Sequence, residues 1–239
     1  CNHWWMSVCF YRGLRARDIY VNAPDWYFLN GTSKTAMGYR ESDWSLPRDR
    51  QIIIERQNIY DGTWTKTPSM GWTFVPLTQY HGGGSAATIE PLSEHLHDYD
   101  AHLMQNFGSG VQACYRGPRL FDTPATEALV KKDVNWYKKY RDILNSDIIH
   151  LRRADGKDWD GILHVNPKLK EKGFVMLYNP LNKDITRTIK LPLYYTGLSK
   201  TASIRIENGP AKTYRLNRDY SVEIKVTIAA QGYSWLVIQ

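Results

Sequence analysis

Residues 111–144, VQACYRGPRLFDTPATEALVKKDVNWYKKYRDIL, indicate most clearly how this chain folds. Residues 111–115 are short and apolar, as a buried strand requires, and a polar loop with a Gly-Pro pair follows them. Apolar side chains then recur close to the 3.6-residue helical period over residues 125–144. The stretch therefore predicts a strand, a chemically rich loop and an amphipathic helix with the apolar stripe Val130, Val134, Tyr137 and Leu144.

Two similar units precede this one, and a helix precedes them all. Turn and helix-start signals place these elements: a helix at 3–14, a strand at 19–22 with a helix at 47–60, and a strand at 72–77 with a helix from Pro91 to just before Gly108. Strands that alternate with helices form a parallel sheet with right-handed crossovers. The loops that follow the strands are long, and the returns from helix to strand are shorter.

This asymmetry is typical of a (β/α)8 TIM barrel, whose active site is built from the loops at the C-terminal ends of the strands. Three units are fewer than eight. The expected fold class is therefore α/β, with the C-terminal part of a barrel in residues 1–155. The chain begins at Cys1, without an initiator Met or a signal peptide. We expect a preceding N-terminal segment of the same protein to complete the barrel.

Residues 156–239 follow a different pattern. Short apolar runs are separated by turn signals such as Asn179-Pro180 and Asn208-Gly209. Apolar residues at 222, 224, 226 and 228 alternate with polar ones, which predicts one buried and one solvent-facing side. We expect a small antiparallel β-sandwich as a second domain.

Composition excludes several classes of protein. The chain has 239 residues, of which 42% are hydrophobic, and no run approaches the ~20 apolar residues of a membrane span. The net charge of +7 lies mostly in residues 156–239, without an arginine-rich run or an aromatic RNA-binding motif, so nucleic-acid binding is disfavoured. Three cysteines without short spacing predict neither a disulfide framework nor a zinc site. We expect Cys9 and Cys114 to be small core residues.

Trp and Tyr are unusually frequent, with 9 and 16 residues against 6 Phe. Rings with a polar edge suit sugar platforms, although some of them, such as Trp136 and Trp235, are expected to fill a core. The strongest candidate site is YVNAPDWY at 20–27. Here Asp25 follows a buried strand and Trp26 stands beside it, as a glycosidase acid or nucleophile would require. The alternative is that Asp25 caps a turn or the next helix.

A second cluster, GYRESDW at 38–44, offers Glu41 as a second carboxylate and Arg40 as its orienting partner or a hydroxyl ligand. Equally, Asp43 or Ser45 caps the following helix. Glu55 and Arg56 lie mid-helix and are expected to form a solvated or interhelical pair. Tyr80 and His81 open the glycine-rich loop and suit hydrogen bonds to a bound sugar. An oxyanion hole there would need a G-x-S-x-G elbow, which the sequence lacks.

Tyr115, Arg116, Arg119 and Asp122 follow the strand at 111–115. Two arginines there either grip an anionic or richly hydroxylated substrate or neutralise neighbouring carboxylates. The histidines at 95, 97 and 102 include no i,i+4 pair, so no metal site is expected. Nothing in the sequence calls for a cofactor.

The runs YVNAPDWYFLNGT, GYRESDWSLPR, RQNIYDGTW, QYHGGG and GSGVQACYRGPRLFDT resemble a group of large bacterial proteins distantly similar to the α-galactosidase (melibiase) superfamily of glycoside hydrolases. The tail from GFVMLYNPLNKDITRTIKLPL onward is similar to the C-terminal β-sandwich of such enzymes. The resemblance implies retaining hydrolysis of a complex glycan, without a cofactor, by a secreted or periplasmic enzyme. Asp25 would be the acid/base, with the nucleophile before Cys1, or the nucleophile with Glu41 as its acid. The alternative is a non-catalytic carbohydrate-binding or scaffold protein with a degenerate barrel.

Overall fold

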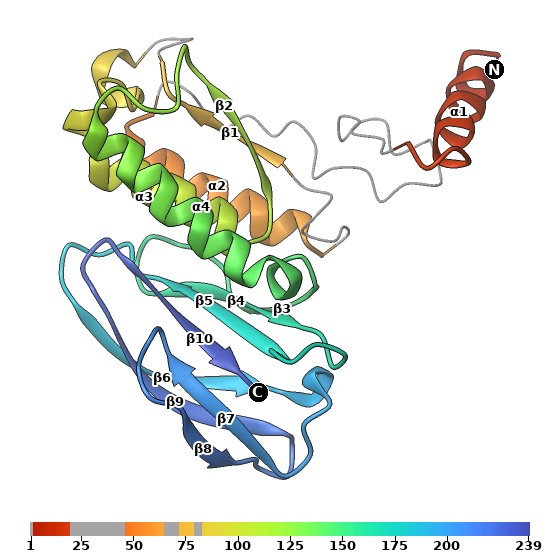
Figure 1. Ribbon diagram of the computed structural model, residues 1–239, viewed down its shortest axis with the longest axis vertical. Helices are drawn as coiled ribbons and strands as arrows, with labels where there is room; N and C mark the ends of the chain where they lie inside the picture. Colours follow the sequence, from red (N-terminus) through yellow and green to blue (C-terminus); the bar gives the residue numbers. More distant parts are fainter. Residues whose placement is uncertain (1, 20–45, 65–71, 79–82) are drawn as a thin grey trace.

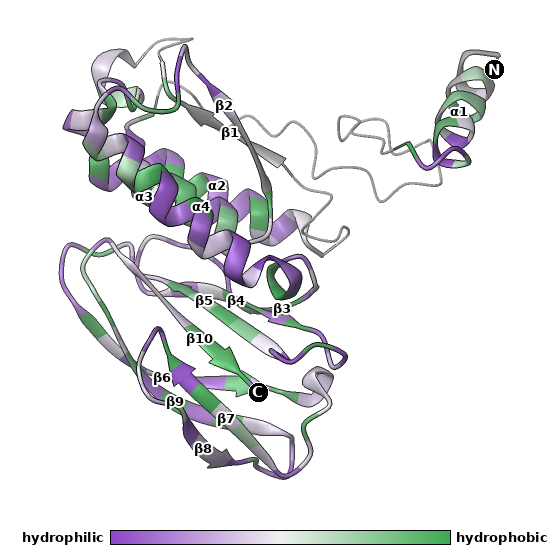
Figure 2. Ribbon diagram, in the orientation of Figure 1, coloured by the Kyte–Doolittle hydropathy of each residue, from purple (hydrophilic) through white to green (hydrophobic). Residues whose placement is uncertain are grey.

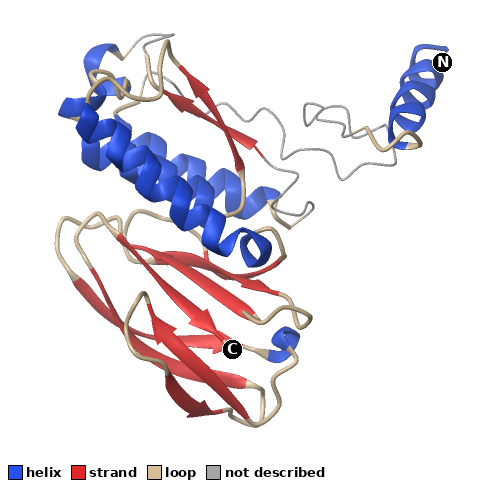
Figure 3. Cartoon of the chain, in the orientation of Figure 1, coloured by secondary structure: helices blue, strands red, loops and turns tan. Residues whose placement is uncertain are grey.

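The computed structural model of the protein describes residues 2–19, 46–64, 72–78 and 83–239. Figure 1 shows a helical layer with two strands stacked on a set of antiparallel strands, and helix α1 (Asn2–Arg15) at the N-terminus. The α-helices lie within residues 2–144, and strands β3 to β10 follow them (Figure 3). The fold is therefore α/β with mostly antiparallel sheets.

Strands β1 (Trp72–Pro76) and β2 (Gln112–Arg116) pair in parallel, with Trp72 opposite Gln112 and Pro76 opposite Arg116. The chain runs between them through two short 3₁₀ turns, η3 (Gly84–Ala87) and η4 (Leu92–Glu94), and helix α3 (Leu96–Gly108). This strand–helix–strand unit confirms the parallel pairing predicted from the alternation of elements. Parallel pairing brings the C-terminal ends of both strands to one edge.

Helices α2 (Arg48–Gly62), α3 and α4 (Pro124–Leu144) form the helical layer. Helix α4 begins where the sequence predicts because Thr123 caps it: its side chain accepts a hydrogen bond from the Thr126 backbone N–H. Pro124, with its fixed φ, occupies the first turn.

The buried face of α4 differs from the predicted stripe, of which Val130, Val134 and Tyr137 are only half-buried. Leu144 is fully buried as expected, and the burial extends to Tyr140 and Ile143, which pack against Phe174 and Met176. Trp136 and Trp235 belong to the same cluster, with ring centroids 5.5 Å apart, which confirms that these two rings fill a core. A helical period marks only one stripe, whereas α4 contacts both α3 and the sheet beneath it.

The remaining strands form a six-stranded sheet of order β3-β4-β5-β10-β7-β8 and a two-stranded sheet β6-β9. Their bounds are β3 (Asp147–Arg152), β4 (Asp160–Val165), β5 (Gly173–Tyr178), β6 (Ile185–Pro192), β7 (Thr201–Ile206), β8 (Lys212–Arg215), β9 (Ser221–Ile228) and β10 (Tyr233–Ile238). A short turn, η5 (Tyr194–Thr196), follows β6. All these pairings are antiparallel.

One hydrophobic cluster joins the two sheets, with Val175 and Leu236 from the larger and Ile189 and Ile224 from the smaller. The predicted alternation in β9 is confirmed, since its apolar residues are buried and Glu223, Lys225 and Thr227 are exposed. Strands β4 and β5 are buried at every position because helices cover their other face. Apolar positions accordingly concentrate along β4, β5 and β10 (Figure 2).

The sequence does not predict two of the strands, β3 and β8. Strand β3 pairs with β4, so the six-stranded sheet begins upstream of residue 156. Strand β8 is a short edge strand. The core position expected for Cys9 is wrong: its thiol is free and exposed, because apolar neighbours in a helix do not decide which face is covered. Within the described ranges, no helix is both long and apolar enough to cross a bilayer.

Candidate functional site

The C-terminal ends of β1 and β2 form the candidate site. Beyond the last strand pair, the backbone N–H groups of Leu77 and Thr78 donate to the Arg116 carbonyl at 2.9 and 3.1 Å. The loops after β1 and β2 therefore leave the sheet from one point. In parallel α/β sheets this is the edge at which ligands bind. We call Glu90, Tyr115, Arg116, Arg119 and Asp122, with their loops, the strand-end site.

The strand-end site contains three of the residues expected to bind substrate: Tyr115, Arg116 and Arg119. The other expected site residues lie outside the described part of the chain: Asp25, Trp26, Arg40, Glu41, Tyr80 and His81.

Arg119 joins the two loops. Its Nε donates to Oε1 of Glu90 at 2.9 Å, and the side chains are 55% and 20% exposed. Of the two roles considered for the arginines, this contact favours neutralisation of a carboxylate for Arg119. Glu90 was not singled out in the sequence, although its place in the loop after a strand is the signal that could have found it. More than half of the Arg119 side chain still faces solvent and can meet a ligand.

Asp122 anchors the second loop to helix α4. Its carboxylate accepts hydrogen bonds from the Ser93 N–H at 3.1 Å, the Ser93 hydroxyl at 3.2 Å and the Thr126 hydroxyl at 2.9 Å. Desolvation opposes the charged form, but these hydrogen bonds outweigh it and lower the pKa of Asp122. Asp122 is thus an ionised structural group that fixes the loop.

Tyr115 is the member of the strand-end site that packs into the core. It packs against the cluster of Leu77, Tyr99 and Leu103, and its hydroxyl is buried without a hydrogen-bond partner among the described residues. Burial, reinforced by neighbouring acidic groups, raises the pKa of Tyr115, so the phenol stays protonated at neutral pH. Its ring supports the site from below.

A buried polar cluster links α2 and α3. Nδ1 of His102 lies 3.2 Å from Oε2 of Glu55, and the amide of Gln105 donates to the same oxygen. Glu55, His102 and Gln105 are all essentially excluded from solvent. Glu55 therefore makes the interhelical contact that was one of its two expected roles. Among the described residues, no group of three or more His, Cys, Asp or Glu side chains is placed to hold a metal ion.

Several solved structures share the fold of this chain. No family model and no curated protein matches the chain. A GH27 β-L-arabinopyranosidase from Geobacillus stearothermophilus matches 83% of this chain, at a TM-score of 0.54 and 9% identity. The galactosidase domain of an α-galactosidase–sucrose kinase matches 78%, at 0.51 and 14%. AmyP bound to maltotriose matches 92%, at 0.50 and 10%.

The chain spans only part of these proteins: 43% of the arabinopyranosidase, 24% of the galactosidase domain and 55% of AmyP. All three are glycoside hydrolases, and identities this low establish a shared fold alone. The distant resemblance to glycoside hydrolases of the α-galactosidase type is therefore confirmed at the level of fold.

Proposed function

We propose that this chain is the C-terminal part of a retaining glycoside hydrolase that acts on a complex glycan. In this proposal residues 1–155 carry the last units of a TIM barrel, completed by a preceding segment, and residues 156–239 form a C-terminal β-sandwich. Three observations support the division: the parallel β1–β2 unit, the two antiparallel sheets around one core, and the fold shared with glycoside hydrolases.

The observation that carries the proposal is the meeting of two long loops at the strand ends, joined by the Arg119–Glu90 ion pair. A glycoside hydrolase on this fold needs its carboxylates at such an edge, on loops that are held in a fixed position. Asp25, which follows the strand expected at 19–22, would supply the acid/base or the nucleophile. Glu41 is the proposed second carboxylate.

The substrate would be held by groups with apolar faces and hydrogen-bonding edges. Trp26 offers a ring for the C–H face of a sugar, and Arg40, Tyr80 and His81 offer donors to its hydroxyls. The exposed part of Arg119 completes the subsite. A retaining mechanism requires the two carboxyl groups about 5 Å apart, so that one attacks the anomeric carbon while the other protonates the leaving oxygen.

The test compares Asp25→Asn and Glu41→Gln with the wild-type complete protein, using aryl glycosides of galactose and arabinopyranose and a glycan panel. Either substitution is expected to lower kcat by about 10²–10⁴, because it removes a proton-transfer or nucleophilic group. Sugar binding should survive, since the shapes are retained. Asp43→Asn is the matched control, and its turnover should stay near that of the wild type.

Full activity in both variants would contradict the assignment of these carboxylates. Binding without any turnover in the wild-type protein would favour a carbohydrate-binding module in place of an enzyme.

A further inference from the structure

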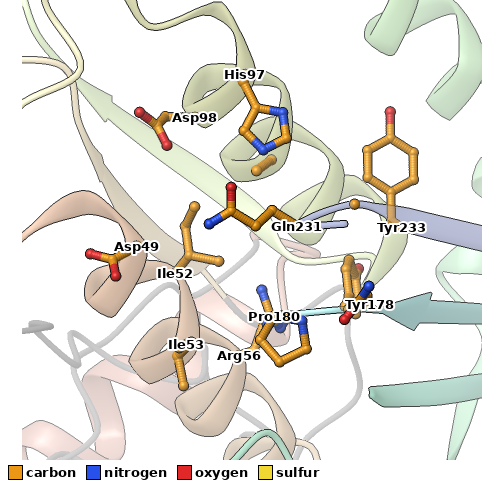
Figure 4. A pocket seen from close by; sticks show the side chains of 13 residues that line it. Asp49, Ile52, Ile53, Arg56, His97, Asp98, Tyr178, Pro180, Gln231 and Tyr233 are labelled. Carbon is orange, nitrogen blue, oxygen red and sulfur yellow. The ribbon is translucent and has the colours of Figure 1, made fainter. Parts of the chain in front are cut away.

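A pocket lies between the helical layer and the six-stranded sheet. Its volume is about 90 Å³, compared with the roughly 10–15 Å³ that one water needs. Helices α2 and α3 form one side, and the C-terminal end of β5 and the β9–β10 turn form the other. Figure 4 shows Gln231 pointing from its turn toward the side formed by the helices.

Most charges around the pocket are already paired. Asp98 accepts from Nε of Arg48 at 2.8 Å, and Arg56 is bound to Asp160. Asp49 forms no ion pair with any residue in the described part of the chain. Among the described lining residues, the pocket thus presents a carboxylate and no uncommitted guanidinium, so it disfavours an anionic ligand.

The remaining lining suits a molecule that is both hydroxylated and apolar. His97 and Gln231 offer ring nitrogens and an amide, and Asp49 adds a carboxylate to the lining. Tyr233 and Pro180 offer flat or compact apolar surface. Carboxylates and amides accept from and donate to neighbouring hydroxyls, while a ring faces the C–H groups.

The backbone at Gln231 strengthens this assignment. Its φ is +48°, in the left-handed region where glycine is favoured, and its N–H donates to the Leu181 carbonyl at 2.8 Å. Glycine would fill this turn position at lower conformational cost. A strained residue that projects an amide into a pocket is the type of outlier from which a functional role is inferred.

We propose that this pocket binds one neutral sugar unit at a site separate from the strand-end site. The inference uses only the lining and the backbone of the pocket, and does not depend on whether the protein hydrolyses glycosides. Asp49 and Gln231 hold the hydroxyls, and Tyr233 lies against the sugar's apolar face.

The test is a calorimetric titration of the complete protein with galactose and glucose, and with glucuronate as the anionic comparison. Gln231→Gly removes the amide and relieves the backbone strain, so it should fold and yet lose one sugar-binding event. Asp49→Ala, on an exposed helical position, should weaken the same event about tenfold or more. Glucuronate should bind this site more weakly than galactose or glucose.

Glu207→Gly is the matched control, because Glu207 also has a positive φ, of 53°, and does not line the pocket. It should bind as the wild type does. Unchanged stoichiometry and affinity in both Gln231→Gly and Asp49→Ala, or equal binding of glucuronate, would overturn the proposal. Absence of any glycoside hydrolysis by the wild-type protein, with this binding intact, would count against the proposed function alone.

Discussion

Arg56 of α2 binds Asp160 of β4 with two hydrogen bonds, of 2.8 and 3.1 Å, across the boundary between the helical layer and the six-stranded sheet. Both side chains are buried, and the guanidinium lies 4.9 Å from the centre of the Tyr178 ring. Two residues 104 positions apart thus fix how the helices sit on the sheet. The pair makes the two layers one unit, which also shapes the pocket beside them.

Breaking this pair should be costly. Arg56→Met or Asp160→Asn leaves a buried group without its partner and should lower the free energy of unfolding by about 3–5 kcal/mol. Removing both charges in a double variant should cost less than the sum of the single changes, because no unpaired charge remains. Chemical denaturation measures the free energy of unfolding of the two single variants and the double variant.

The control is the exposed pair of Arg153 and Asp61, which has two hydrogen bonds of 2.9 Å. Asp61→Asn should cost less than about 1 kcal/mol, since solvent screens the pair. Equal losses at the buried and the exposed pair would refute the structural role given to Arg56.

Gly108 allows α3 to approach β5. A Cβ at this position would lie 2.5 Å from Cγ of Met176 and 2.8 Å from the hydroxyl oxygen of Tyr178. Gly108→Ala should therefore destabilise the protein by about 1–3 kcal/mol, although alanine normally stabilises a helix. Gly13→Ala in α1 is the comparison. Its Cβ meets only the flexible end of Arg17 at 3.4 Å, so it should be neutral or slightly stabilising. If Gly108→Ala left the free energy of unfolding unchanged, α3 and β5 would be packed less tightly than these distances indicate.

Asp133 should make the protein less stable as the pH rises. Burial, then repulsion from Asp100, raises its pKa to about 7 from 3.8. The folded state therefore holds a proton that the unfolded state releases, and the stabilisation present below pH 4 is lost between about pH 4 and 7. Asp133→Asn, which cannot ionise, should be more stable than the wild type at pH 8 by about 4 kcal/mol, and this gain should vanish near pH 4. Thermal unfolding across this range measures it; a gain independent of pH would exclude ionisation as its cause.

His164 should make the protein less stable as the pH falls. Burial lowers its pKa to about 4, and one ring nitrogen lies 2.8 Å from the Gly108 carbonyl. Below pH 6.5 the His164 ring is protonated in the unfolded state but stays neutral in the folded state. The free energy of unfolding therefore falls from pH 6.5 toward 4. The two groups partly cancel in the wild type. Against the Asp133→Asn background the acid-side loss should become visible, and His164→Gln should remove it. If stability still falls between pH 6.5 and 4 in the Asp133→Asn/His164→Gln double variant, groups other than His164 cause the fall.

The sequence predicts those elements whose signals are local. Helix α4 follows from its period, and β9 follows from its alternation. The loops at the strand ends also follow, since Tyr115, Arg116 and Arg119 come after a predicted strand. These are patterns that one segment contains entirely.

The features that the sequence does not predict depend on contacts with residues far away along the chain. Strand β3 is only half-buried, so it carries no clear alternation and is defined by its pairing with β4. The partner of Arg56 is 104 residues away, and the pocket around Gln231 is assembled from four separate segments. Cys9 has apolar neighbours, yet its exposure depends on what covers α1.

The most direct test of the central claim is a proton NMR time course of glycoside hydrolysis by the complete protein, recorded before the released sugar mutarotates. The account predicts release of a sugar whose first anomer has the configuration of the substrate, with the reaction abolished by Asp25→Asn. Release of the inverted anomer would contradict the retaining mechanism, and absence of any released sugar across the glycan panel would contradict the assignment as a glycoside hydrolase.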